Sequence, residues 1–113
     1  MSDKFEFKDL ERGDFNMGYI ELEKKYNIYS KSKMITYEEF CDFVSKLNDM
    51  HKVKVVYDRE RKRVVACVTL IREEKFSNIF LHLSDIFIDS NTEDKKNIEK
   101  YLFESIKKNE SDS

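Results

Sequence analysis

Proline is absent from this chain of 113 residues, and glycine occurs only at Gly13 and Gly18. Loops that cradle a phosphate usually contain glycine, because it lets the backbone approach the phosphate closely. Neither glycine lies near a predicted turn from a strand into a helix. The sequence therefore offers no glycine-rich phosphate loop of the ordinary kind.

Cysteine and histidine are also scarce. Cys41 and Cys67 are far apart, and neither belongs to a CxxC pair. His51 and His82 are too isolated to suggest zinc, which takes four nitrogen or sulfur ligands at characteristic spacing. We therefore predict two reduced thiols, with Cys67 in the core of a strand, and no metal site.

Long apolar segments are missing as well. No run approaches the roughly 20 residues that a transmembrane helix needs. The N-terminal residues also lack the apolar region of a signal peptide. We therefore expect a cytoplasmic protein with no membrane partner.

Charge is abundant: 39% of the residues are charged and 40% are hydrophobic, with a net charge of −2. Because both signs are mixed along the chain, nothing favours a nucleic-acid partner. The basic residues within 59–63 have no aromatic neighbour for base stacking, which indicates a solvated turn. The length allows a single domain, residues 1–113, with its core over about residues 5–106 and a polar tail at 107–113.

Apolar spacing predicts one strand and two helices in the first half. Residues 5–10 alternate as a short strand. A first helix follows, with Asp14 as its N-cap and apolar residues at steps of three and four. These residues are Phe15, Tyr19, Leu22 and Tyr26. Thr36 and Glu39 form a capping-box pattern that opens a second helix.

The second half predicts strands at residues 52–57, 63–71 and 76–88, the last one long, bent or broken in two. Charged turns at 58–63 and 72–75 separate them, and residues 90–93 cap a final helix. Its inward residues are Ile98, Tyr101, Leu102 and Ile106. The order β-α-α-β-β-β-α indicates an α+β domain with an antiparallel or mixed sheet flanked by helices.

This order and several segments resemble the GNAT superfamily of N-acetyltransferases, and within it the glucosamine-6-phosphate N-acetyltransferases. The similar segments are residues 7–22 (FKDLERGDFNMGYIEL), 35–47 (ITYEEFCDFVSKL), 55–76 (VVYDRERKRVVACVTLIREEKF) and 82–89 (HLSDIFID). The resemblance implies a fold in which acetyl-CoA lies between two splayed strands and gives its acetyl group to the amine of an amino-sugar phosphate.

The resemblance also implies site residues. Ser84 and Asp85 would flank the amine as catalytic residues. Glu73 and Lys75 would face the sugar phosphate or, as we favour, belong to a solvated hairpin turn. The cofactor-binding residues would be Ile86, Phe87 and Ile88 for the pantetheine arm and Asn91, Lys95 and Lys96 for the pyrophosphate. Ser84 stands where the family has a carboxylate, and serine needs an activating partner to act as a base. His82 shares its strand face; it is either that partner or, as we favour, a structural or surface residue.

The pyrophosphate turn departs from the family pattern. Glu93 takes the place of an arginine, and Asp94 and Ile98 take the places of glycines. A carboxylate about 4 Å from a phosphate charge costs about 4 kcal/mol at an effective dielectric constant near 20. The helix dipole returns only about 0.3–1 kcal/mol. Lys95 and Lys96 would offset part of this cost.

The similarity ends with the final helix, whereas the family continues with two more strands. We therefore expect an open sheet edge that a second copy or another protein covers, as a homodimer or heteromer. Two functions follow: an acetyltransferase for an amino-sugar phosphate with weak or no activity, or a non-catalytic binding or assembly module. On the residues alone, the second is favoured.

Overall fold

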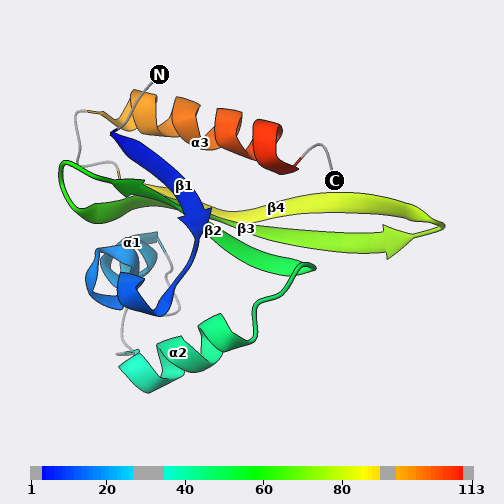
Figure 1. Ribbon diagram of the computed structural model, residues 1–113, viewed down its shortest axis with the longest axis horizontal. Coiled ribbons are helices and arrows are strands. Elements are labelled where there is room, and N and C mark those ends of the chain that lie inside the picture. Colours follow the sequence, from blue (N-terminus) through cyan, green and yellow to red (C-terminus); the bar gives the residue numbers. More distant parts are fainter. Residues whose placement is uncertain (1–3, 27–34, 90–93, 111–113) are drawn as a thin grey trace.

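The structure is a computed structural model that describes residues 4–26, 35–89 and 94–110. A four-stranded antiparallel sheet, ordered β1-β2-β3-β4, forms its centre, with α3 on one face and α1 and α2 on the other (Figure 1). The elements are β1 (Phe5–Asp9), a 3-10 helix (Arg12–Asn16), α1 (Tyr19–Tyr26), α2 (Tyr37–Ser45), β2 (His51–Asp58), β3 (Arg63–Lys75), β4 (Asn78–Ile88) and α3 (Lys95–Glu110). This order confirms the predicted α+β class. In the described part of the chain, no helix is long and apolar enough to cross a membrane.

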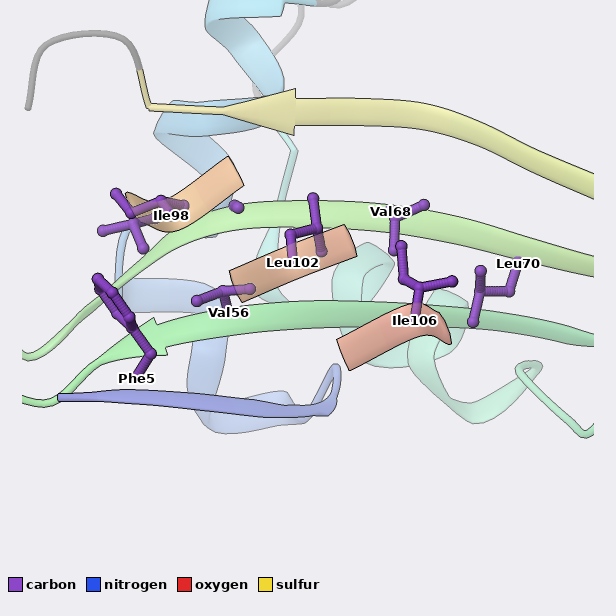
Figure 2. Close-up of a cluster of buried hydrophobic side chains, with 9 residues drawn as sticks. Phe5, Val56, Val68, Leu70, Ile98, Leu102 and Ile106 are labelled. Carbon is purple, nitrogen blue, oxygen red and sulfur yellow. The ribbon is translucent and has the colours of Figure 1, made fainter. Parts of the chain in front are cut away.

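The core on the α3 side is a stripe of apolar residues at helical spacing. Ile98, Leu102 and Ile106 are buried and point at the sheet, where Figure 2 shows them over side chains of the strands. Each such side chain contributes about 1.5–3 kcal/mol when fully buried. The predicted inward face is confirmed for these three residues. Tyr101 is half-buried beside them and donates a hydrogen bond from its hydroxyl to the Phe5 carbonyl oxygen at 3.2 Å.

The core on the other face lies under α1 and α2. Its buried members are Leu10, Tyr19, Ile20, Leu22, Phe40, Val53, Val55, Val64 and Cys67. The predicted capping box is confirmed, because the Glu39 backbone N–H donates to the Thr36 hydroxyl at 3.1 Å and the Glu39 carboxylate accepts from Thr36. The prediction that Cys67 lies in a strand core is confirmed as well.

The start of the first helix differs from the prediction. Asp14 is not the N-cap of α1; it lies buried in the 3-10 helix and accepts hydrogen bonds from Lys8 Nζ and the Glu11 backbone N–H, both at 2.8 Å. Gly18 separates the two helices because its φ of +96° is one that side chains rarely allow. A Cβ there would also lie 3.1 Å from the Val64 carbonyl oxygen.

The hairpin between β3 and β4 also differs from the prediction. Residues 72–75 were predicted as a turn, but they continue β3, where Glu73 pairs with Phe80 and Lys75 with Asn78. The turn lies instead at Phe76 and Ser77, both with positive φ, the backbone of a tight type I′ hairpin. Cross-strand pairing therefore overrides the low strand preference of the charged residues. The hairpin extends past all three helices (Figure 1).

The turn between β2 and β3 is organised by a buried carboxylate. Asp58 is 0% exposed, and its Oδ1 accepts from the backbone N–H groups of Glu60 at 2.9 Å and Arg61 at 3.1 Å. Arg61 also donates from its guanidinium to Oδ2 at 2.6 Å. Burial by itself would raise the pKa of Asp58, but these hydrogen bonds outweigh it and hold the pKa below its ordinary value.

The variant Asp58→Ala is expected to lower the free energy of unfolding by about 2–3 kcal/mol, because it leaves two backbone donors without their acceptor and removes one of the two carboxylates that bind Arg61. Urea unfolding at neutral pH measures this. Asp9→Ala is the control, because Asp9 is 70% exposed in its pair with Lys54 and should cost at most about 1 kcal/mol. Equal losses for both variants would contradict the role given to Asp58.

Candidate functional site

The most distinctive backbone feature is a bulge in β4. Ser84 pairs with Thr69 and Phe87 with Cys67, so Asp85 and Ile86 together face Val68 alone. Asp85 takes a φ of +49°, a left-handed conformation that aspartate and asparagine tolerate better than most residues. Such bulges re-aim a side chain and are over-represented beside active sites.

A pocket of about 340 Å³ opens beside this bulge, between the sheet and the helices α1 and α2. Its lining comes from four elements, α1, α2, β3 and β4, and from Ile35, two residues before α2. The lining residues are Tyr19, Ile20, Ile35, Glu39, Phe40, Phe43, Cys67, Thr69, Asp85 and Phe87. We call it the bulge pocket. Its walls are mostly apolar, and Glu39 and Asp85 are the two acidic groups among them.

Of the two predicted catalytic residues, only Asp85 lines the bulge pocket. Ser84 is exposed on β4, one position before the bulge. His82 lies 3.3 Å from Glu73, measured from Nε2 to Oε2, and both side chains are more than half exposed. His82 is therefore placed as a surface residue that pairs with Glu73, which agrees with the role we favoured.

The predicted cofactor-binding strand leads from the bulge toward α3. Ile86 is exposed, Phe87 packs against the core on the α1 and α2 side, and Ile88 packs against the core under α3. Lys95 and Lys96 form the exposed first turn of α3. Asn91 and Glu93 lie outside the described residues, as do the residues predicted to cap α3.

Asp94 immediately precedes α3, and two cations hold its carboxylate. Lys4 Nζ donates to Oδ2, and Arg61 donates to the same oxygen at 3.2 Å while it also binds Asp58. The hydrogen bonds from Lys4 and Arg61 hold the pKa of Asp94 below its ordinary value. The sequence could not show this pairing, because the partners lie 90 and 33 positions away.

This pairing bears on the part of the predicted electrostatic cost that is due to Asp94. Since Lys4 and Arg61 both contact Asp94, its charge is partly offset, and a bound anion would meet a smaller repulsion from this carboxylate. The part due to Glu93 stays a prediction, because Glu93 lies outside the described residues.

The two residues predicted to face a sugar phosphate lie elsewhere. Glu73 and Lys75 are exposed in the outer part of β3, and Lys75 Nζ lies 5.7 Å from the centre of the Phe76 ring. Neither lines the bulge pocket. The structure thus places them along the projecting hairpin.

A larger polar groove of about 760 Å³ lies on the opposite face, between β1 and α3. Lys4, Asp94, Lys100 and Tyr101 are among its lining residues, and none of the predicted site residues is. Over the described residues, no three histidine, cysteine, aspartate or glutamate side chains are grouped as a metal ion would need.

The strand and helix order gives a fold that is shared with solved structures of GNAT acetyltransferases. One solved structure with this fold is a glucosamine-6-phosphate N-acetyltransferase from Arabidopsis thaliana, with a TM-score of 0.73 at 23% identity, which covers 94% of this chain and 76% of that one. An acetyltransferase from Trypanosoma brucei follows, with a TM-score of 0.67 at 18% identity over 92% and 75% of the two chains.

A GNAT family acetyltransferase from Staphylococcus aureus has a TM-score of 0.57 at 9% identity over 90% of this chain and 75% of that one. No family model matches the sequence, and no curated protein matches it. At these identities the likeness establishes the fold.

Asp94 is expected to account for part of the loss of stability in acid. Its folded-state pKa is lowered, so the stabilisation is full above the unfolded-state pKa of about 3.9 and is lost as the pH falls through the folded-state value. Asp94→Asn removes this titration, so its stability should fall less steeply than that of the wild type between about pH 5 and pH 2. Urea unfolding across this range provides the measurement.

Lys4→Gln should also reduce the acid loss, because Asp94 then titrates nearer its unfolded-state pKa. The double variant should behave like Asp94→Asn alone, since both changes act through one pair. Effects that simply add would show that Lys4 and Asp94 are not coupled.

Proposed function

We propose that this protein binds acetyl-CoA along β4, from the bulge to the first turn of α3, and transfers the acetyl group to a primary amine held in the bulge pocket. The observation that carries the proposal is the coincidence of the bulge with the pocket wall at Asp85. A strand that departs from its ladder beside a pocket presents backbone groups to a ligand.

The bulge fits the chemistry of acyl transfer. When the amine nitrogen bonds to the acetyl carbon, the C–S bond of acetyl-CoA breaks, and the CoA thiolate takes one of the two protons that the nitrogen loses. Asp85 and Ile86 fall outside the regular β3–β4 register, so a backbone N–H there can donate to the acyl oxygen as its negative charge develops. The Asp85 carboxylate holds the ammonium form of the amine and accepts the other proton.

The start of α3 fits the pyrophosphate. A helix N-terminus presents free N–H groups and the positive end of its dipole to an anion. Lys95 and Lys96 are exposed in this first turn, and the charge of Asp94 is offset by Lys4 and Arg61. These residues support the choice of a phosphorylated carrier such as CoA.

A second candidate function is assembly through the projecting β3–β4 hairpin. Every residue from Asn78 to Ile86 is exposed, and Phe76 at the tip is 86% exposed. The exposed apolar side chains here are Phe76, Ile79, Phe80, Leu81, Leu83 and Ile86. Apolar patches of this kind often mark interaction sites. Sedimentation equilibrium tests this candidate, and a monomer at high protein concentration would contradict self-association.

The protein is expected to bind acetyl-CoA at micromolar affinity in a calorimetric titration at low salt. Lys95→Gln with Lys96→Gln should weaken binding about five- to tenfold, since exposed charge pairs contribute about 0.2–1 kcal/mol each. The binding should also become less sensitive to salt. Release of CoA thiol on addition of primary amines then measures transfer.

Lys107→Gln with Lys108→Gln is the control, because it makes the same change of charge in the last turn of the same helix. This control should leave acetyl-CoA affinity within about twofold of the wild type. No heat of binding at millimolar acetyl-CoA would contradict the proposed function.

A further inference from the structure

We infer that the acceptor is a primary amine with an apolar, preferably aromatic, body, and that amino-sugar phosphates are poor ligands of the bulge pocket. The inference rests on the proposed function for its catalytic meaning. Its evidence is that three phenylalanines and two acidic residues line one pocket, with no basic residue among its described lining.

The walls of the bulge pocket are suited to an apolar group. Phe40 is 3% exposed and forms part of the core, whereas Phe43 and Phe87 keep part of their surface open. The ring centroids of Tyr19 and Phe40 lie 5.7 Å apart at a tilt of 54°, so aromatic packing is already present there. A sugar would leave most of its hydroxyl groups facing hydrocarbon, which is unfavourable unless each one finds a partner.

The charges of the bulge pocket favour a cation. Glu39 and Asp85 are its ionisable carboxylates, and no lysine or arginine is among the described residues that line it. The Glu39 carboxylate is oriented by hydrogen bonds from the Thr36 backbone N–H and hydroxyl, both at 3.2 Å. An ammonium group is attracted both by carboxylates and by the faces of aromatic rings, whereas a phosphate is repelled by the carboxylates.

The volume of the bulge pocket sets the size of the ligand. About 340 Å³ lies at the lower end of the range for small-molecule sites, roughly 300–1,000 Å³. A single ring with a short aminoalkyl chain is a ligand of this class. 2-Phenylethylamine carries both required features, an aromatic body and an ammonium group, and is the probe for the test.

Binding of 2-phenylethylamine and of glucosamine 6-phosphate to the free protein is measured by calorimetry and by NMR of the pocket side chains. We expect the aromatic amine to bind at least about tenfold more tightly. Asp85→Asn keeps a residue that tolerates the left-handed backbone and removes only the charge. It should therefore weaken binding of the amine about tenfold. Phe43→Ala, at a partly exposed position, should weaken it by a similar factor.

Asp42→Asn is the matched control, because it makes the same change of charge on α2, outside the pocket. Asp42 is exposed and pairs with Lys46. This variant should leave the affinity unchanged. Glucosamine 6-phosphate bound as tightly as the amine, or no amine binding at millimolar concentration, would overturn the inference. The acetyl-CoA titration reports separately on the proposed function. If the amine binds but acetyl-CoA does not, the pocket assignment stands and the transferase function is contradicted.

Discussion

One charge network joins parts of the fold that are distant in the chain. Arg61 binds two carboxylates through the same nitrogen, Asp58 in its own turn and Asp94 at the start of α3, and Lys4 just before β1 closes the group. The Asp58 carboxylate also accepts from two backbone N–H groups of its own turn. The position of α3 on the sheet is therefore fixed by apolar packing along its length and by charge at its first turn.

Two bulges decide what each face of the sheet presents. In β3, Val65 is the extra residue, because Val56 pairs with Ala66 and Tyr57 with Val64. This shift lets both Val65 and Ala66 join the core under α3, while Val64 and Cys67 serve the core under α1 and α2. The second bulge, in β4, places Asp85 beside the pocket on that latter face. A one-residue insertion in a strand therefore decides which side chains join a core and which residues lie beside the pocket.

Local patterns predicted the elements well wherever one face of a helix or strand is buried. The spacing of Ile98, Leu102 and Ile106 predicted the buried face of α3. The pair of Thr36 and Glu39 predicted the start of α2. Features that depend on distant partners could not be predicted: the charges around Asp94, the bulge at Asp85, and the strand character of residues 72–75. The resemblance pointed to Asp85 and Phe87, whose part in a site stays a prediction. Phe40 and Phe43 gave no signal of a site, because aromatic residues at helical spacing predict a buried helix face.

The two ends of the β3–β4 hairpin are expected to differ in how easily they open locally. Its inner end is held between two cores, whereas its outer end has solvent on both faces and a turn of two residues with positive φ. Backbone amides there exchange with solvent through small fluctuations, while those near Cys67 and Phe87 exchange only when the domain opens more widely. The outer hairpin is therefore expected to open locally without disturbing the pocket at its base.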